Sequence, residues 1–227
     1  TEALELERIA KKLTKKGMFS ADCPVSGGCH RAETGNISIF AGCDRMVFER
    51  IKPLLFILGK KILHTGPLGS ASKLKVMTNF LATTNLIACC EALTTMKIAK
   101  LDLSTTYEAI RISSGNSFVH ETESQVILNG SRDINFTLEL VLKDISLFQE
   151  IADNNNIPLE ISPLLNKIVD KAIDKLGPRA NSPSIISLLE NLTGTKILAP
   201  GFPSKITDNE RESLGYEVIP TITNNLK

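Results

Sequence analysis

The chain has 227 residues, of which 42% are hydrophobic and 22% are charged, and 26 basic residues against 25 acidic ones leave a net charge of +1. That length is enough for one large domain or two small ones with a buried core. The balanced charge gives no reason to expect nucleic acid or an anionic membrane as a partner, which argues against the classes of protein that work through a basic surface.

The apolar runs, the first residues and the cysteines of the chain indicate its cellular compartment. The purest apolar run, residues 54–58, is far shorter than the ~20 residues that cross a bilayer, and no secretory signal opens the chain. Five cysteines is an odd number, and Cys89 adjoins Cys90, which favours a reducing, cytoplasmic setting over a disulfide framework. Because Thr1 leads into a helical pattern without an initiating Met, we expect a fragment or a processed product, with a mitochondrial matrix location if a transit peptide lies upstream.

The first part of the chain alternates between helix and strand patterns. Hydrophobic periodicity predicts a helix over residues 2–16 that ends at Gly17. Residues 18–22 and 37–40 are strand candidates, and Asp44 can cap the helix that follows the second strand. This order of elements suits the closing part of an α/β domain.

The pattern becomes helical from residue 70 onward. Residues 70–114 contain neither Gly nor Pro, and the 27 residues 73–99 carry an apolar stripe at helical spacing. A helix of that length would extend ~40 Å. Four further helical patterns predict an all-helical region: residues 104–112, 138–154, 162–176 and 182–192. The domains predicted from these patterns are an α/β part over residues 1–68, an all-helical domain over residues 69–192 and an extended tail over residues 193–227.

A first motif is Asp22-Cys23-Pro24-Val25-Ser26-Gly27-Gly28. A Ser hydroxyl followed by two glycines offers one side-chain donor and backbone N–H groups that a ligand can approach closely. Such a turn can hold a carboxylate or a phosphate, although Ser-Gly-Gly taken alone is more often a flexible turn.

A second motif is Gly66-Pro67-Leu68-Gly69, which leads into the predicted long helix with Lys75 and Asn79. The spacing of four residues places the ammonium and the carboxamide on one face of that helix, one turn apart. This is a plausible proton-transfer pair, although a surface Lys near an Asn is commoner. A third candidate, Lys143-Asp144, taken alone is typical of an ordinary amphipathic helix.

In this order and spacing the motifs resemble the β-hydroxyacid dehydrogenase family, which includes 3-hydroxyisobutyrate dehydrogenase. The resemblance covers residues 2–189 and extends to the helical domain of 6-phosphogluconate dehydrogenase. Further matching positions are Ala32-x-x-Gly35-Asn36, Glu91, Ser113-Ser114-Gly115 and Phe136 ahead of Leu142-Lys143-Asp144.

The resemblance implies a fold, a reaction and roles for residues. The fold would be the α/β end of a Rossmann domain, a long interdomain helix and an all-α C-terminal domain. The reaction would be hydride transfer between NAD or NADP and a small carboxylate substrate, a short β-hydroxyacid or its semialdehyde. The implied roles are substrate binding for Ser26, Gly27 and Gly28, general acid/base catalysis for Lys75, orientation of substrate and lysine for Asn79, and cofactor binding for Lys143, Asp144 and Phe136.

Lys75 can act as a base near neutral pH only if burial away from water lowers its pKa. A Lys at its ordinary pKa of ~10.4 is a poor base at neutral pH. Burial against the cofactor and apolar walls would disfavour the ammonium and lower that pKa. The resemblance also implies a homodimer or homotetramer. The helices carry apolar residues that neighbouring elements or a second subunit must cover: Leu81, Leu93, Leu138, Val141 and Leu165.

The chain departs from the family pattern in three residues and in one whole segment. Thr78 replaces the first of two common Asn residues, Ala71 replaces a Gly, and Cys23 replaces an Ala. No Gly-x-Gly-x-x-Gly fingerprint for a dinucleotide occurs in the 227 residues. We therefore expect the chain to hold the catalytic lysine and the substrate loop but not the main cofactor cradle, and to be inactive alone.

A zinc site is the weaker interpretation of Cys23, Cys29, His30 and Cys43. Their spacing lacks the paired Cys-x2-Cys of structural zinc sites, so no metal is predicted. His64 and His120 are single histidines, and we expect them to be ordinary loop or surface residues.

Two alternatives to a hydroxyacid dehydrogenase stay open. One is a non-catalytic dimerisation or scaffold module derived from the family. It is disfavoured because a scaffold has no physical need for Ser26, Lys75 and Asn79 together. The other is an imine reductase of similar architecture, which ranks lower because Lys75 suits alcohol and carbonyl chemistry. Neither the particular hydroxyacid nor the choice of NAD or NADP follows from the sequence.

Overall fold

The computed structural model describes residues 3–220 of the chain. Two compact units divide this range: the described residues up to Lys75 together with those from Thr207 onward, and Val76–Ile206. The division falls inside one long helix, α4 (Ser70–Ile98). The two units are referred to below as the first and the second unit.

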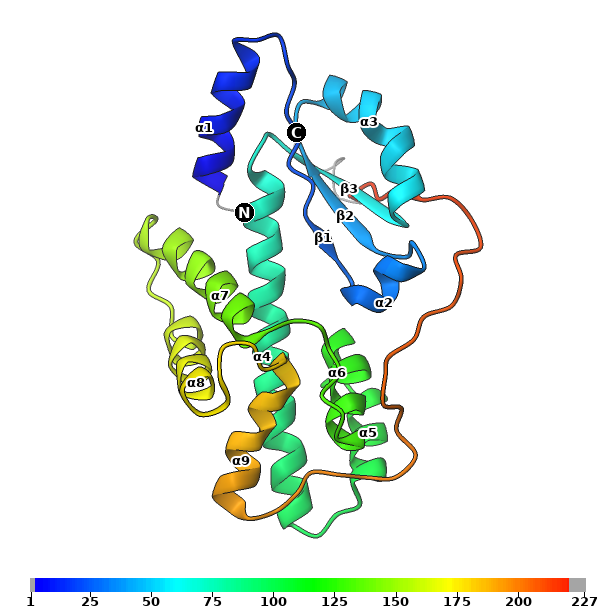
Figure 1. The fold of residues 1–227 in the computed structure, drawn as a ribbon, viewed down its shortest axis with the longest axis vertical. Coiled ribbons are helices and arrows are strands. Elements are labelled where there is room, and N and C mark those ends of the chain that lie inside the picture. The colour runs from blue at the N-terminus through cyan, green and yellow to red at the C-terminus, as the bar shows by residue number, and fades with distance from the viewer. Residues whose placement is uncertain (1–2, 221–227) are drawn as a thin grey trace, which may run out of the picture. The chain divides into compact units, whose positions relative to one another are not determined.

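Within the described residues, the first unit is built on a four-stranded mixed sheet. β1 runs antiparallel to β2, whereas the β2–β3 and β3–β4 pairs are parallel. The strands lie in the order β1 (Val25–Ser26), β2 (Ser38–Gly42), β3 (Lys61–Gly66) and β4 (Tyr216–Glu217). The helices of this unit before α4 are α1 (Ala3–Thr14), α2 (Gly28–Glu33) and α3 (Arg45–Leu58), and Figure 1 shows α3 beside β2 and β3.

The core of the first unit joins α3 to β2 and β3. Burial alternates along β2, where Ile39 and Ala41 are buried and Phe40 is only partly so, as the two-residue period of a strand requires. Val47, Phe48 and Leu55 of α3 and Ile62 of β3 complete the cluster with Ile37 and Cys43.

One sequence prediction for the first unit was wrong, and two of its strands were not predicted. Residues 18–22 do not form a strand; they contribute a single bridge between Asp22 and Gly42, and the paired strand is β1, after Pro24. Strands β3 and β4 had no individual prediction. β4 is two residues long and pairs with a strand more than a hundred residues earlier in the chain. No local sequence pattern could therefore have predicted it.

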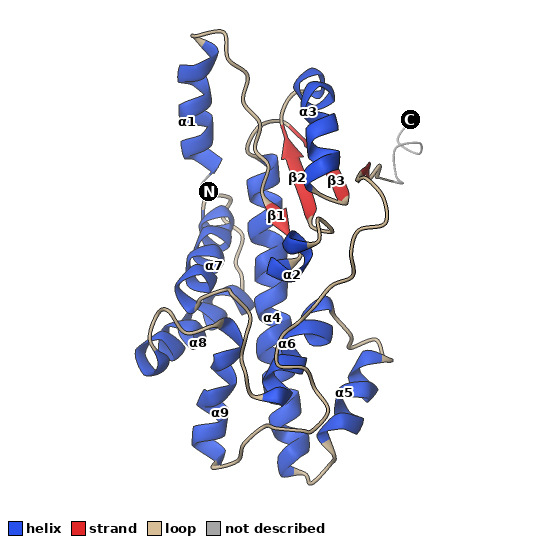
Figure 2. Cartoon of the chain, turned by 45° about the vertical axis from the view of Figure 1, so that its right-hand side comes forward, coloured by secondary structure: helices blue, strands red, loops and turns tan. Residues whose placement is uncertain are grey.

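All regular elements described in the second unit are helices, drawn in blue in Figure 2. They are the rest of α4, α5 (Leu103–Arg111), α6 (Phe118–Asn129), α7 (Leu138–Asp153), α8 (Ile161–Leu176), the 3-10 helix η1 (Ser182–Ile185) and α9 (Ile186–Thr193). α7 and α8 pack against each other as a pair. Residues from all of these helices enclose one apolar core, whose fully buried members include Leu93, Ile127, Leu128, Leu138, Ile145, Val169 and Ile186.

Most of these helices match the predicted ones within a few residues, and α6 is the one without an individual prediction. Its ends are nevertheless well marked. The Ser117 hydroxyl accepts a hydrogen bond from the His120 N–H at the start, and Gly130 ends the helix in the left-handed conformation that glycine favours. The long helix is confirmed over Ser70–Ile98, 29 residues.

The segment after α9 contains no helix in its described part, and it belongs to the second unit up to Ile206 and to the first unit from Thr207 onward. Ile197 is fully buried in the core of the second unit, and the Ala199 N–H donates to the Leu128 carbonyl over 3.0 Å. Further on, Asp208 and Arg211 bond to residues of the first unit, ahead of β4. The domain limits at residues 68 and 192 stay predictions.

α4 also has the length and the apolar composition of a membrane-crossing helix, the single such case within residues 3–220. Core helices of soluble proteins meet the same criterion. Leu86, Cys90 and Leu93 of α4 lie in the core of the second unit.

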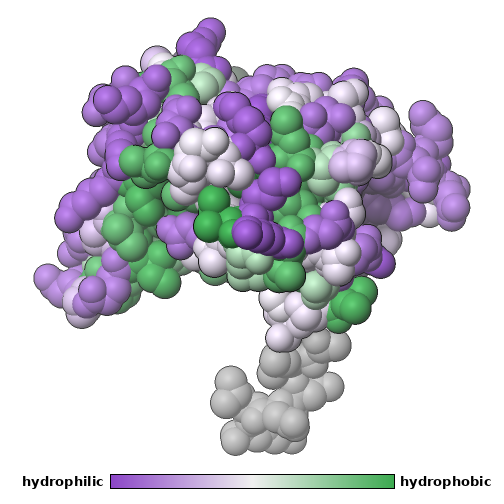
Figure 3. All heavy atoms as spheres, turned by 90° about the horizontal axis from the view of Figure 1, so that it is seen from below, coloured by the Kyte–Doolittle hydropathy of each residue, from purple (hydrophilic) through white to green (hydrophobic). Residues whose placement is uncertain are grey.

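The apolar residues for which the sequence predicted cover by neighbouring elements or by a second subunit are mostly buried within the second unit. Leu93, Leu138, Val141 and Leu165 are no more than 3% exposed, whereas Leu81 is 50% exposed. Figure 3 shows that hydrophobic residues, in green, nevertheless reach the surface seen from below, among hydrophilic ones in purple. Packing within one chain therefore covers most of these apolar side chains, and the predicted oligomer stays a prediction.

Candidate functional site

The loop from Ser26 to Gly28 connects the edge strand β1 to α2 in the first unit. Ser26 is half-buried and lies opposite Ser38 in the antiparallel β1–β2 pair. Gly27 and Gly28 have φ angles of 135° and 81°, in the region that side chains disfavour. A Cβ at Gly28 would also lie 3.0 Å from the His30 ring. Glycine is therefore required here both for the backbone geometry and for the close approach of the His30 and Arg31 side chains.

The start of α4, which carries Lys75 in its second turn, is closely joined to the ends of β2 and β3. The Thr65 and Ser70 hydroxyl oxygens are 2.7 Å apart, and the Cys43 N–H donates to the Gly66 carbonyl over 2.8 Å. A Cβ at Gly42 would meet the Ser70 hydroxyl at 3.0 Å, so the helix approaches the strand as closely as a glycine allows. Lys75 itself is half-buried.

A hydrogen-bonded group in the second unit joins three of the predicted site residues. The Asn79 side-chain nitrogen donates to Asp144 Oδ2 over 2.5 Å, and the Lys143 ammonium lies 3.0 Å from Asp144 Oδ1. Asp144 is 8% exposed, and the side chain of Lys143 is 51% exposed. The carboxylate thus holds the amide from α4 and leaves much of the lysine side chain of α7 open to solvent.

The other residues that match the family pattern do not belong to this hydrogen-bonded group. Phe136 is partly buried against the core of the second unit, and its carbonyl accepts a hydrogen bond from the Ser182 N–H over 2.8 Å. Glu91 is exposed on α4, and residues 113–115 form an exposed turn after α5. Ser26, Gly27 and Gly28 belong to the first unit, whereas Asn79, Lys143 and Asp144 belong to the second.

Two cysteines of the first unit, Cys23 and Cys43, show the properties of packed thiols, whereas Cys29 is exposed. Burial raises the pKa of Cys23 to about 11, with a smaller contribution from the neighbouring Cys43, and burial also raises the pKa of Cys43. A thiol must lose its proton to bind a metal. Among residues 3–220 no three His, Cys, Asp or Glu side chains are grouped so that they could hold a metal ion.

His120 is not the loop or surface residue that the sequence suggested. It is fully buried in α6, where Nε2 lies 2.9 Å from the Tyr107 carbonyl and Nδ1 lies 3.1 Å from the Ser124 hydroxyl. Burial lowers its pKa, so the neutral ring is favoured. Its partners Tyr107 and Ser124 lie thirteen and four residues away, and the i+4 Ser was the one local sign of this arrangement.

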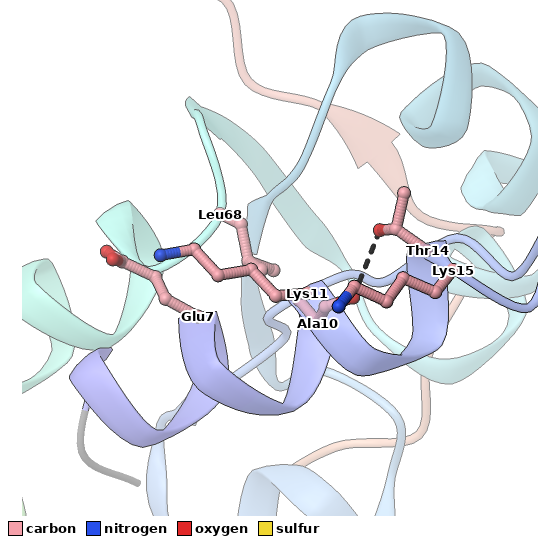
Figure 4. Close-up of a pocket in the computed structure, with 6 residues that line it drawn as sticks. All are labelled: Glu7, Ala10, Lys11, Thr14, Lys15 and Leu68. Atoms are coloured by element: carbon pink, nitrogen blue, oxygen red, sulfur yellow. Dashed lines mark hydrogen bonds between the residues drawn. The ribbon is translucent and has the colours of Figure 1, made fainter.

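An open hollow of about 570 Å³ lies beside α1 in the first unit, as Figure 4 shows. Its lining comes from one face of α1 and from the loop before α4: Glu7, Ala10, Lys11, Thr14, Lys15 and Leu68. The Thr14 hydroxyl donates to the Ala10 carbonyl of its own helix over 3.0 Å. None of the predicted site residues lines this hollow.

Two family models together match most of the chain. Residues 69–189 match the NAD-binding domain of NADP-dependent 3-hydroxyisobutyrate dehydrogenase, and residues 1–66 match the NAD binding domain of 6-phosphogluconate dehydrogenase.

Curated relatives are longer than this chain. The 2-(hydroxymethyl)glutarate dehydrogenase of Eubacterium barkeri is 31% identical over 191 residues, which are 84% of this chain and 64% of that protein. The mitochondrial 3-hydroxyisobutyrate dehydrogenase of Drosophila melanogaster is 28% identical over 177 residues, 75% of this chain and 55% of that one. The chain therefore spans less than two thirds of the length of these relatives.

Solved structures share the fold. The crystal structure of 3-hydroxyisobutyrate dehydrogenase from Salmonella typhimurium superposes with a TM-score of 0.76 at 23% identity, over 82% of this chain and 66% of that one. The Mycobacterium tuberculosis 3-hydroxyisobutyrate dehydrogenase gives a TM-score of 0.74 at 22% identity, over 83% of this chain and 67% of that one. The predicted fold class, the end of a Rossmann domain followed by a helical domain, is confirmed.

Proposed function

Because this chain belongs to the β-hydroxyacid dehydrogenase family, whose members include 3-hydroxyisobutyrate dehydrogenase, we propose that it forms the substrate-binding and proton-transfer part of such an enzyme. The cofactor of the family is NAD or NADP, as both matched families are NAD-binding domains. The proposed reaction moves a hydride between that cofactor and a short β-hydroxyacid or its semialdehyde.

The group formed by Asn79, Asp144 and Lys143 is the observation that carries the proposal. Asn79 and Asp144 are 65 residues apart in the chain, yet they share a short hydrogen bond. Burying a carboxylate costs free energy unless charged or polar partners compensate for it. A scaffold could fill this position with apolar residues, so a half-exposed lysine held by a buried carboxylate favours a binding function.

The proposed mechanism assigns proton transfer to Lys75. Oxidation of an alcohol requires removal of the hydroxyl proton as the hydride leaves. Lys75 takes that proton through Nζ, and in the reductive direction it returns a proton to the carbonyl oxygen. Bound NAD(P)⁺ supplies the hydride acceptor. Asn79, one turn further along α4, orients the substrate oxygen and the lysine.

The substrate carboxylate is assigned to the loop of Ser26, Gly27 and Gly28. The serine hydroxyl and the backbone N–H groups of the two glycines are donors, and donors to a carboxylate form charge-assisted hydrogen bonds. Neither glycine adds a side chain of its own to this turn, and both adopt positive φ angles.

The residues present fit one part of the cofactor. Lys143 would bind the cofactor, Asp144 would hold that lysine in place through their contact of 3.0 Å, and Phe136 would add a further contact. No Gly-x-Gly-x-x-Gly loop for the pyrophosphate occurs in the 227 residues. We propose accordingly that turnover needs a longer protein that includes this loop, and that the 227-residue chain alone is inactive.

Steady-state kinetics of such a longer protein test the proposal. The substrates suggested by the relatives are 2-(hydroxymethyl)glutarate, 3-hydroxyisobutyrate, L-threonate and 2-hydroxy-3-oxopropionate, each with both nicotinamide cofactors. Formation or loss of the reduced nicotinamide is followed by absorbance. No turnover with any of a broad panel of hydroxyacids and semialdehydes would favour the scaffold alternative.

A further inference from the structure

Asp22 is a buried carboxylate that has no role in the proposed mechanism. It is 4% exposed and lies four residues before Ser26. One carboxylate oxygen accepts the backbone N–H of Ser72 over 2.7 Å, and the other accepts the Ser72 hydroxyl over 2.9 Å. A single side chain therefore joins the segment just before β1 to the first turn of α4, 50 residues further along the chain.

The contact at Ser72 is a helix cap supplied from a distant part of the sequence. Ser72 is the third residue of α4, and the first four N–H groups of a helix have no partner within the helix. A carboxylate that accepts one of them satisfies the donor and opposes the positive end of the helix dipole. The position and rotation of the first turn are thereby tied to Asp22.

Asp22 is itself held firmly by the sheet. Its N–H donates to the Gly42 carbonyl over 2.9 Å, and its carbonyl accepts the Gly42 N–H over 2.8 Å. The pairing continues toward the loop, where the Phe40 N–H donates to the Pro24 carbonyl over 3.0 Å and Ser26 lies opposite Ser38. The substrate loop is thus anchored to β2 through the backbone, independently of the Asp22 side chain.

We propose that Asp22 is a positioning residue that sets Lys75 relative to the Ser26–Gly28 loop, an inference that rests on the proposed function. Lys75 follows Ser72 by three residues, slightly less than one turn and about 4.5 Å of helix rise. Since a helix is stiff over one turn, a shift of the first turn moves the lysine by a similar amount. Small displacements of a proton donor relative to a bound substrate cost large factors in rate.

The test is a double-mutant cycle in a longer protein with measured hydroxyacid turnover. Asp22→Asn keeps the size of the side chain and removes the charge and one acceptor. We expect kcat to fall ten- to a hundredfold while KM for the hydroxyacid changes less than threefold, because the loop keeps its backbone pairing. In a Lys75→Ala background the same substitution should lower kcat less than threefold further, because Asp22 acts through Lys75.

Two controls separate this role from a general loss of stability. Ser72→Ala removes the hydroxyl and leaves the backbone N–H, so kcat should change less than threefold. Asp208→Asn removes a carboxylate of the same unit that accepts hydrogen bonds from Thr34 and Asn36 over 2.7 and 2.8 Å, away from α4. That variant should keep its kcat. All variants are assayed well below their melting temperatures, so that the folded fraction is the same.

The outcomes are distinguishable. An equal loss of kcat for Asp22→Asn with and without Lys75 would overturn the inference, as would a loss of less than threefold in the single variant. Full activity of Lys75→Ala would overturn the proposed function itself, and with it the inference, whatever the Asp22 variants show. If Asp22→Asn fails to fold, Asp22→Glu replaces it, because it keeps the charge and lengthens the side chain. We expect the same ten- to hundredfold loss of kcat, and again a further loss of less than threefold in the Lys75→Ala background.

Discussion

Asn79 of α4 and Asp144 of α7 share a hydrogen bond of 2.5 Å between the amide nitrogen and Oδ2. The second carboxylate oxygen of Asp144 lies 3.0 Å from the Lys143 ammonium. One buried carboxylate therefore fixes the amide of the proposed catalytic pair and the lysine assigned to the cofactor. The proposed roles of Asn79 and Lys143 therefore depend on the same residue, Asp144.

Removing the Asp144 carboxylate should destabilise the second unit. Asp144→Ala leaves the Asn79 amide and the Lys143 ammonium without this partner, and such a loss typically costs about 1–3 kcal/mol. The measurement is the free energy of unfolding in denaturant. Asp170→Ala, at an exposed position on α8, is the matched control and should change that energy by less than about 0.5 kcal/mol. Equal stability of the two variants would show that the group at Asp144 is unimportant for folding.

Lys75→Ala should abolish most of the turnover in an active longer protein. General acid–base catalysis typically contributes ~10²–10⁴-fold, so kcat should fall by a factor in that range while the nicotinamide nucleotide binds almost as before. Lys73→Ala, at an exposed position two residues earlier on the same helix, should leave kcat unchanged. A loss of less than about tenfold in the Lys75 variant would refute its role as acid and base.

Ser26→Ala should weaken substrate binding more than it slows the chemical step. One hydrogen bond to a charged group contributes roughly 1.5–3 kcal/mol, so KM should rise by one to two orders of magnitude. Ser38→Ala, which alters the residue opposite Ser26 in β2, is the control and should leave KM nearly unchanged. Unaltered substrate affinity in calorimetric titration of Ser26→Ala would reduce Ser26 to a turn residue.

Glu123 should make the folded state less stable as the pH rises. The residue as a whole is only half-buried, but its carboxyl group is desolvated, which raises its pKa to about 7 despite a hydrogen bond from the Ser182 hydroxyl over 2.9 Å. Because the folded-state pKa lies above the ordinary value of 4.5, the stabilisation is fully present below that value and is lost as the pH rises through about 7. The loss is on the order of 3 kcal/mol.

Denaturant unfolding between pH 4 and pH 8 measures this effect. Glu123→Gln cannot ionise, so its stability should fall less over the interval than that of the unmodified chain. Glu121→Gln, at an exposed position on the same helix, should retain the full pH dependence. Parallel curves for the chain and Glu123→Gln would show that Glu123 ionises normally in the folded state.

The 227-residue chain alone should associate and yet remain inactive. The family resemblance implies a homodimer or homotetramer, and large hydrophobic side chains such as Leu81 and Leu164 are at least half exposed in the second unit. We expect activity to need a pyrophosphate-binding glycine loop, a motif that the 227 residues do not contain and that Lys143 should not replace. Light scattering gives the mass and nicotinamide absorbance gives the turnover. A monomer would contradict the first part, and any turnover above background the second.

The sequence by itself determined most of the helices of this chain, though not α2 or α6, and it determined the motifs. Helices have a period of 3.6 residues, so the apolar stripe of residues 73–99 predicted α4 from local information, and four later stripes did the same for their helices. The Ser26-Gly27-Gly28 turn was also visible locally, because a chain that must adopt positive φ uses glycine. These features depend on residues a few positions apart, which is why they could be predicted.

The tertiary structure alone decided which polar groups are paired. Asp22 contacts Ser72 across 50 residues and Asn79 contacts Asp144 across 65, while β4 joins β3 after the whole second unit has intervened. His120 was expected to be a loop or surface residue and is fully buried. A carboxylate or an imidazole looks the same in the sequence whether it faces water or a partner. Its environment is set by chain segments that folding brings together, and no local period encodes that choice.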